Sequence, residues 1–155
     1  MQIVLFAPEI PPNTGNIARL CAATCTELHL IEPLGFSLDN RHLKRAGLDY
    51  WPDVRLNVWS DWSAYASSGK LRRAIMTSAG GGEAVHHFAF DVGDSLVFGP
   101  ETRGLPPEIL SVSPCKVRIP MNNPHARSLN LSTSAGIVLY MALAACGVLD
   151  TYRLA

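Results

Sequence analysis

The sequence lacks the patterns that mark secreted, membrane, zinc-binding and common nucleotide-binding proteins. Neither GxGxxG nor GxxxxGK[ST] occurs among its 155 residues. Its four cysteines form no CxxC pair and have no histidines at zinc-ligand spacing, so we expect reduced thiols and no metal site. The first apolar run is too short for a signal peptide, and the apolar stretch 135–149 is shorter than a bilayer span. We therefore expect a soluble, cytoplasmic protein that does not enter a membrane.

Charge is also scarce, because charged residues make up only 17% of the chain and the formal net charge is zero. This balance argues against a generic binder of polyanions, although it does not exclude a local basic face. Apolar residues make up 48%, which is typical of a compact globular protein. The length suits one core, and no linker or internal repeat divides the sequence. We expect a single domain over residues 1–155.

Strand-like and helix-like segments alternate along the chain. Short apolar runs predict strands at 2–7, 27–31, 54–59 and 72–77, and two more that open at Leu96 and Ile119. Spacing and capping residues predict helices at about 14–24 with Asn13 as N-cap, after Asp39, from Ser60 or Asp61, from about Pro106, and at about 130–147. This alternation predicts an α/β fold, with a mostly parallel sheet and helices on both faces.

Polar loops follow the last two predicted strands. Residues 96–104 read LVFGPETRG, and residues 119–132 read IPMNNPHARSLNLS. Ligands of open α/β sheets bind beyond the carboxyl ends of the strands, so two such loops in succession predict a binding site. Ser128 and Asn130 are also ordinary helix caps. Both interpretations hold together, since a helix N-terminus presents free amides to a ligand.

A third polar patch, NTGNIAR at 13–19, opens the first predicted helix. Together with both loops and the segments LIEPLGF (30–36) and KRAGLDY (44–50), it resembles the motifs of the SPOUT superfamily of S-adenosylmethionine-dependent RNA methyltransferases. Within that superfamily, it is most similar to the branch that 2′-O-methylates the wobble nucleotide of tRNA. The resemblance covers nearly the whole chain. It implies a C-terminal trefoil knot, which no pattern predicts, a homodimer, S-adenosylmethionine as cofactor, and the tRNA anticodon stem-loop as substrate.

The resemblance also implies a set of cofactor contacts, which fall on Met76, Gly99, Ile119 and Ser128. Apolar side chains at two of these positions suit an adenine, and a glycine lets the backbone approach a ligand closely. The remaining polar contacts would come from backbone amides and from Ser128.

The catalytic positions implied by the resemblance are Arg19, Glu101, Asn130 and Tyr140. Guanidinium stays protonated at any ordinary pH, so we favour Arg19 as an anchor for a phosphate or for the developing 2′-oxyanion over a general base. The alternative for Arg19 is an exposed helix arginine with its stem packed on the surface. Glu101 either organises its loop, for example by pairing with Arg103, or lies near the cofactor or substrate. An aromatic residue at the place of Tyr140 is usually part of a core or an interface.

Candidate RNA contacts are the cations Arg41, Lys44, Arg45 and Arg127, with Lys70, Arg72 and Arg73 as further candidates. A charge cluster is usually only a solvated face, but cations gathered on one side would give the local positive footprint that RNA needs. The predicted last helix is apolar on more than one face, which indicates burial by a deep core or by a partner subunit.

The function that we predict is S-adenosylmethionine-dependent 2′-O-methylation of tRNA nucleotide 34, a cytidine or a modified uridine. Bases of the anticodon loop are unpaired and can be splayed into a site. One alternative is the same chemistry at another tRNA or rRNA position. The other is a non-catalytic RNA- or nucleotide-binding module.

Overall fold

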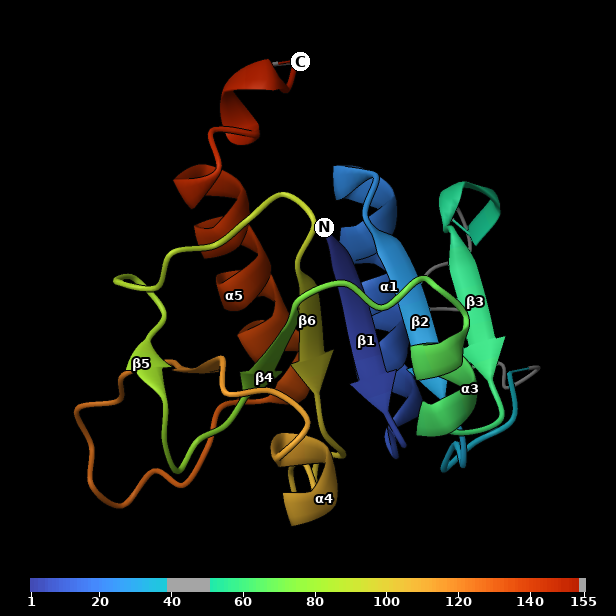
Figure 1. The fold of residues 1–155 in the computed structure, drawn as a ribbon, viewed down its shortest axis with the longest axis horizontal. Coiled ribbons are helices and arrows are strands. Elements are labelled where there is room, and N and C mark those ends of the chain that lie inside the picture. The colour runs from blue at the N-terminus through green and yellow to red at the C-terminus, as the bar shows by residue number, and fades with distance from the viewer. Residues whose placement is uncertain (39–50, 154–155) are drawn as a thin grey trace.

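The computed structural model describes residues 1–38 and 51–153. Within these residues, seven strands form one sheet in the order β3-β2-β1-β6-β4-β7-β5, and every pairing among them is parallel. The strands are β1 (Gln2–Phe6), β2 (Glu27–Ile31), β3 (Leu56–Trp59), β4 (Ala74–Thr77), β5 (Glu83–Ala84), β6 (Ser95–Phe98) and β7 (Lys116–Arg118). The predicted α/β fold with a parallel sheet is therefore confirmed (Figure 1).

Helices cover both faces of the sheet, as predicted (Figure 1). One face packs against α1 (Pro11–Thr24) and α5 (Leu131–Ala145), and the other against the short helices α3 (Trp62–Ser67) and α4 (Pro107–Leu110). Two 3-10 turns, η1 (Trp51–Asp53) and η2 (Leu149–Thr151), complete the elements of the described residues. Side chains alternate along β1 between the two cores, because Ile3 and Leu5 belong to one apolar cluster and Val4 to the other.

Two of the predicted caps, Asp61 and Asn130, are confirmed, whereas Asn13 and Ser128 do not cap a helix. Asp61 accepts from the backbone N–H of Ala64, and Asn130 accepts from those of Ser132 and Thr133. Asn13, in contrast, is not an N-cap, because α1 begins at Pro11 and the extended residue Ile10 holds the cap position. Proline is favoured in the first turn of a helix, since it has no N–H to leave unpaired there.

The last strand was also predicted at the wrong place. We expected a strand that opens at Ile119, but β7 ends one residue earlier, at Arg118. It pairs with β4 through Lys116 and Val117. Charged residues flank the single buried Val117, so the segment does not read as an apolar run. The helix predicted after Asp39 lies outside the described residues. In the part of the chain that the structure covers, no helix is long and apolar enough to cross a bilayer.

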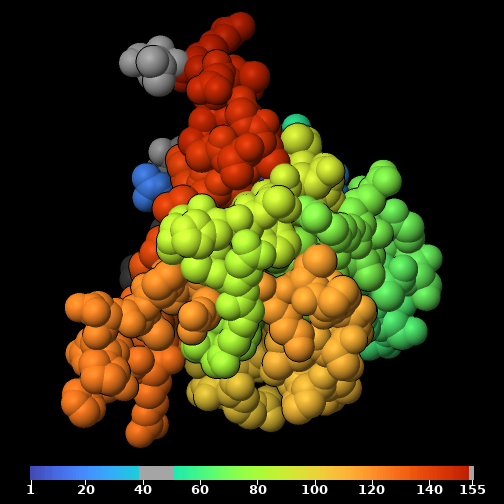
Figure 2. All heavy atoms as spheres, turned by 60° about the vertical axis from the view of Figure 1, so that its left-hand side comes forward, coloured from blue at the N-terminus to red at the C-terminus, as the bar shows by residue number. Residues whose placement is uncertain are grey.

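Strand order determines which loops meet. Because β1, β6, β4 and β7 are consecutive neighbours and all parallel, the loops that follow them leave the same carboxyl edge of the sheet side by side. In the space-filling view, the loop after β7, coloured orange, projects beside the yellow-green segment of residues 80–90 (Figure 2). The predicted meeting of the two C-terminal loops is thus a consequence of topology.

Candidate active site

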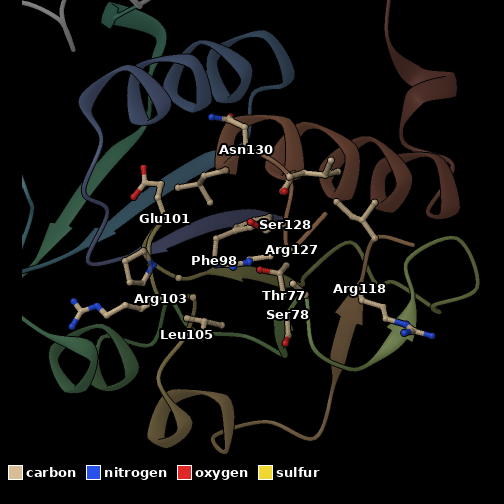
Figure 3. Close-up of a pocket in the computed structure, with 18 of the residues that line it drawn as sticks. Thr77, Ser78, Phe98, Glu101, Arg103, Leu105, Arg118, Arg127, Ser128 and Asn130 are labelled. Atoms are coloured by element: carbon tan, nitrogen blue, oxygen red, sulfur yellow. The ribbon is translucent and has the colours of Figure 1, made fainter. Parts of the chain in front are cut away.

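A cavity of about 610 Å³ opens at the carboxyl edge of the sheet. Its floor is apolar and is formed by residues of β6, β7, α4 and α5 and of the loop after β6: Phe98, Leu105, Leu110, Val117, Leu131 and Val138. Its rim is polar and comes from the loops after β4, β6 and β7 (Figure 3). Volume and lining both suit a small organic ligand, since such pockets are mostly apolar and carry a few well-placed polar groups.

A line of three side chains joins the three polar patches of the sequence. The Nδ2 amide of Asn13 donates to Oε1 of Glu101 at 3.0 Å, and Nδ2 of Asn130 donates to Oδ1 of Asn13 at 2.9 Å. Oδ1 of Asn130 caps α5 by accepting from the N–H of Ser132 at 2.9 Å. A carboxylate oxygen can only accept in such a bond from an amide, so Glu101 fixes the orientation of the Asn13 amide, and Asn13 in turn fixes that of Asn130.

Glu101 organises its loop, but not through the neighbour that was considered. Its carboxylate also accepts from the backbone N–H groups of Glu9 at 2.8 Å and Ile10 at 3.2 Å, in the loop after β1. Arg103 instead approaches Glu9, with Nη2 at 3.8 Å from Oε1. The predicted alternative of a Glu101–Arg103 pair is therefore replaced by contacts that tie two loops together.

Gly99 is required by the loop itself. A Cβ atom on Gly99 would lie 2.2 Å from the backbone nitrogen of Leu105 and 2.3 Å from the carbonyl carbon of Gly104. Gly104 has a φ of +69°, and its N–H donates to the carbonyl of Pro100 at 2.9 Å. The close approach expected at Gly99 is thus between two parts of one loop, which turns back on itself at the wall of the cavity.

Three of the four predicted cofactor contacts line the cavity, namely Gly99, Ile119 and Ser128. The side chain of Met76 does not, because it is fully buried in the apolar cluster that also holds Val4 and Val97. The apolar wall predicted from Met76 is therefore not part of the lining of this cavity. The next residues along the chain, Thr77 and Ser78, line the cavity instead, and the hydroxyl of Thr77 donates to the carbonyl of Val97 at 2.8 Å.

The predicted catalytic residues divide into two groups. Glu101 and Asn130 line the cavity, whereas Arg19 and Tyr140 are not part of its lining. Arg19 is exposed and lies on α1, six residues beyond Asn13. Tyr140 is 46% exposed on α5, next to the exposed Met141. The structure thus brings Glu101 and Asn130 together at the cavity but leaves Arg19 and Tyr140 outside it.

The predicted RNA contacts also differ in their surroundings. Arg127 lines the cavity and lies near its middle, while Arg103 and Arg118 point outward on opposite sides (Figure 3). Arg73 is committed elsewhere, because its guanidinium binds both carboxylate oxygens of the buried Asp94 at 2.8 and 2.7 Å. The three cations at 41, 44 and 45 lie outside the described residues.

Sequence reasoning missed Asn13, Thr77, Ser78 and Arg118 as parts of the cavity wall. Asn13 was taken for a helix cap, and nothing local separates a capping asparagine from one that reaches across to another loop. Within the described residues, no group of three His, Cys, Asp or Glu side chains could hold a metal ion. The cavity therefore offers amide, carboxylate, hydroxyl and guanidinium groups around an apolar floor.

Comparison with known proteins connects this geometry to a reaction. The model of the SpoU rRNA Methylase family matches residues 1–140. The tRNA (cytidine(34)-2'-O)-methyltransferase of Methylovorus glucosotrophus strain SIP3-4 is 52% identical over 143 residues, or 91% of this chain and 92% of that protein. The protein of the same name from Escherichia coli strain K12 is 46% identical over 144 residues, or 92% of this chain and 91% of that protein. A solved structure described as giving insights into the 2-OH methylation of C/U34 on tRNA has a TM-score of 0.89 at 44% identity and covers 97% of both chains.

Proposed function

Because the chain belongs to the SpoU rRNA methylase family, we propose that it transfers a methyl group from S-adenosylmethionine to the 2′-hydroxyl of tRNA nucleotide 34. The family match bears out the likeness to SPOUT methyltransferases in the motifs. The assignment of nucleotide 34 as the target is supported by the sequence identity of 46–52% to the two tRNA (cytidine(34)-2'-O)-methyltransferases, over more than nine-tenths of each chain. A cytidine or a modified uridine is the expected substrate, and such a reaction implies a cytoplasmic enzyme.

The cavity fits the cofactor by its chemistry. The apolar floor around Val117 and Ile119 suits an adenine, and the folded-back loop at Gly99 presents backbone close to the cavity. We propose that Gly99, Ile119 and Ser128 hold the cofactor, and that Met76 supports the pocket from within β4 through its packing. When bound, the cofactor supplies an activated methyl group on a sulfonium, so the protein's task is alignment.

The Glu101–Asn13–Asn130 line is the element that we assign to this alignment. Each amide in the line is fixed by its neighbour, which pre-orients polar groups at the cavity wall before any substrate arrives. Arg19 lies on the same helix as Asn13 but outside the cavity lining, and we propose that it meets the RNA. Arg127 lines the cavity together with Arg103 and Arg118, and it is proposed to contact the RNA backbone.

A trefoil knot and a homodimer belong to the same proposal. β4 lies between β6 and β7, two strands that follow it in the chain, and the loops after both strands border one cavity. This arrangement supports a knot. Support for a dimer comes from α5, where Tyr140 and Met141 are 46% and 43% exposed. Two neighbouring large side chains on one helix suit burial by a second copy of the chain, and Tyr140 would then reach a shared substrate site.

Methylation of unfractionated tRNA with labelled S-adenosylmethionine tests the proposed function. The labelled RNA is digested, and the labelled nucleotide is mapped by mass spectrometry. We expect 2′-O-methylcytidine or a 2′-O-methylated uridine at position 34. Label at another tRNA position would contradict nucleotide 34 as the target but would support the same methyl-transfer chemistry. Binding of tRNA without any transfer would favour the non-catalytic module.

Arg19→Lys tests how the arginine acts. Lysine keeps the positive charge but loses the planar fork that holds two oxygens at once, so we expect kcat to fall about 100-fold. Single-turnover rates at several pH values provide the measurement. A general base would instead give a pH profile that lysine shifts, and near-normal turnover in Arg19→Lys would contradict the anchor.

A further inference from the structure

Two glutamates link the loops after β1 and β6, because each accepts hydrogen bonds from the loop that carries the other. Glu101, in the second loop, accepts from the backbone N–H groups of Glu9 and Ile10 in the first. Glu9 returns the contact, because its carboxylate accepts from the N–H of Thr102 at 3.1 Å and from the hydroxyl of Thr102 at 2.8 Å. Each carboxylate thus holds the backbone of the opposite loop, and the two residues are far apart in the chain.

The loop after β6 has a base that closes on itself and a tip that does not. At the base, Gly99 packs against the backbone of Gly104 and Leu105, and the N–H of Gly104 donates to Pro100. At the tip, the hydrogen bonds and ion pairs of residues 101–103 go to Glu9, Ile10 and Asn13. The tip carries Glu101, and its place therefore depends on the loop after β1.

The loop after β1 is itself held from its other side. The N–H of Gly35 donates to the carbonyl of Pro8 at 2.9 Å, and a Cβ atom on Gly35 would lie 2.8 Å from Cα of Glu9. The N–H of Ala7 donates to the carbonyl of Ile31 at 2.9 Å. The backbone of Glu9 is therefore fixed against the segment after β2, so its carboxylate reaches Thr102 from a rigid support.

We propose that Glu9 is a positioning residue for methyl transfer, acting through Thr102 on the loop tip that carries Glu101. Glu9 is not part of the cavity lining and touches neither cofactor nor substrate in this role. Its carboxylate keeps the tip in the place where Glu101 orients Asn13. It also lies 3.8 Å from Arg103, whose side chain is 77% exposed and keeps donors for an RNA phosphate. The proposal rests on the proposed function.

Glu9→Ala and Glu9→Gln separate this role from a general loss of structure. Alanine removes both contacts to Thr102, and we expect kcat for tRNA methylation to fall about tenfold to 100-fold, since small misplacements of aligned groups cost this much. The KM for S-adenosylmethionine should change less than about threefold, because the base of the loop closes without Glu9. Glutamine keeps an acceptor for Thr102 and should restore most of kcat. Glu108→Gln, an exposed change outside the cavity lining, is the matched control.

Thr102→Val provides a second variant that retains Glu9. It removes the hydroxyl and keeps the backbone N–H, so we expect a smaller fall in kcat in the same direction. The double variant Glu9→Ala/Thr102→Val should have the same kcat as Glu9→Ala alone, since both substitutions disrupt the same Glu9–Thr102 interaction. Glu9→Ala with kcat within about twofold of wild type, or Glu9→Gln as impaired as Glu9→Ala, would overturn the positioning role.

Amide hydrogen exchange tests the same inference without any turnover. In Glu9→Ala, the Thr102 amide should exchange faster, while the Gly104 amide, bonded to Pro100 within the loop, should be unchanged. Equal protection of Thr102 in wild type and variant would contradict the proposal. A wild-type protein that transfers no methyl group, with the expected exchange pattern intact, would overturn the proposed function and leave the loop contact standing.

Discussion

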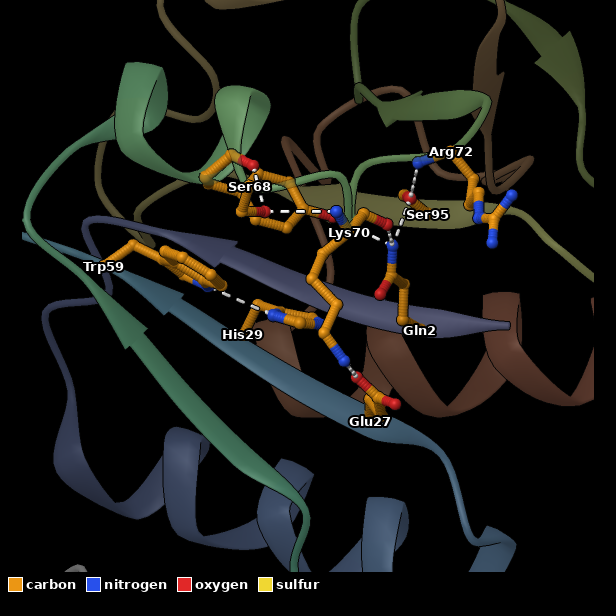
Figure 4. Close-up of polar contacts among 9 residues, drawn as sticks. Gln2, Glu27, His29, Trp59, Ser68, Lys70, Arg72 and Ser95 are labelled. Atoms are coloured by element: carbon orange, nitrogen blue, oxygen red, sulfur yellow. Dashed lines mark hydrogen bonds and ion pairs between the residues drawn. The ribbon is translucent and has the colours of Figure 1, made fainter.

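The carboxyl and amino edges of the sheet both carry networks of polar side chains, but the two networks border very different spaces. At the carboxyl edge, the Glu101–Asn13–Asn130 line borders a cavity of about 610 Å³. At the amino edge, the first residues of β1 and β6 bind one another, because Nε2 of Gln2 donates to Oγ of Ser95 at 2.6 Å (Figure 4). Polar side chains alone therefore do not mark a functional site. The difference lies in the size of the space that the polar groups border, because the hollow beside Gln2, Glu27 and Lys70 at the amino edge is only about 220 Å³.

The amino edge is held together by several side-chain contacts. Gln2 also approaches the hydroxyl of Tyr65 at 3.0 Å and the carbonyl of Lys70 at 2.7 Å, and Asp94 is fully buried beneath the fork of Arg73. Burial raises the pKa of Tyr65 to about 12, so its hydroxyl stays protonated. Such a network stabilises the fold, because each group left without its partner would carry its full desolvation cost.

Substituting alanine for a glycine at each edge should give the largest difference between the two edges. Gly99→Ala places a Cβ 2.2 Å from the nitrogen of Leu105, so the loop must move and we expect methyl transfer to fall more than about 100-fold. Gly93→Ala at the amino edge meets its nearest atom, Oδ1 of Asp91, at 3.9 Å, and should change neither activity nor unfolding free energy beyond about 0.5 kcal/mol. Turnover and urea denaturation measure both. Equal tolerance of the two substitutions would remove the distinction between the edges.

Removing one amide from each edge is the next test. Asn13→Ala interrupts the line between Glu101 and Asn130, and we expect kcat to fall about tenfold to 100-fold with a small change in stability. Gln2→Ala removes the donor to the hydroxyls of Ser95 and Tyr65 and to the carbonyl of Lys70, and it should lower the free energy of unfolding by about 1–3 kcal/mol, while the folded fraction keeps its activity. A large loss of stability in Asn13→Ala with normal kcat would mean that the line is structural.

The sequence predicts the scaffold of both edges better than their side-chain networks. The buried runs of β1, β2 and β6 are long enough to read as strands, and their parallel order follows from alternation with helices. β7 escapes notice because only Val117 in it is buried, and its position depends on pairing with β4. Local pattern cannot supply such tertiary information.

The candidate site shows the same limit at the level of single residues. Two polar loops are visible in the sequence, but the contact from Asn13 to Glu101 joins residues 88 positions apart, and no spacing rule encodes it. Met76 shows a related limit, since the resemblance implies a cofactor contact at this position while its side chain is buried in the core. The roles carried by resemblance therefore need the structure to decide which atoms face the cavity.

His29 gives the amino edge a pH dependence that the carboxyl edge does not require. Its Nδ1 accepts from Nε1 of Trp59 at 3.1 Å, so Nε2 is assigned the proton, and Nε2 lies 3.5 Å from Glu27 without a hydrogen bond. Burial lowers the pKa of His29 from 6.5 to about 4, with Glu27 opposing this effect and Lys70 adding to it. The folded pKa lies below the unfolded one, so the unfolded chain takes up a proton first as the pH falls.

The contribution of His29 to the free energy of unfolding should therefore be fully present above about pH 6.5. It should decline as the pH falls toward about 4, by about 3 kcal/mol at most. Urea denaturation at about pH 7 and about pH 5 measures the decline. His29→Asn, whose Oδ1 can replace Nδ1 as acceptor for Trp59, should reduce the difference between the two pH values. An unchanged difference in His29→Asn would assign the decline to other groups.

The smallest expected effects concern the cations at the two edges. Lys70 pairs with Glu27 at 3.2 Å while 46% exposed, so Lys70→Gln should cost no more than about 1 kcal/mol of stability and leave the KM for tRNA within about twofold. Arg127 lines the cavity, and Arg127→Gln should weaken tRNA binding and reduce the slope of log affinity against log salt by about one. Binding titrations at several salt concentrations compare the two. A reduced slope in Lys70→Gln would place RNA at the amino edge as well, and the polar network there would then need a second role beside stability.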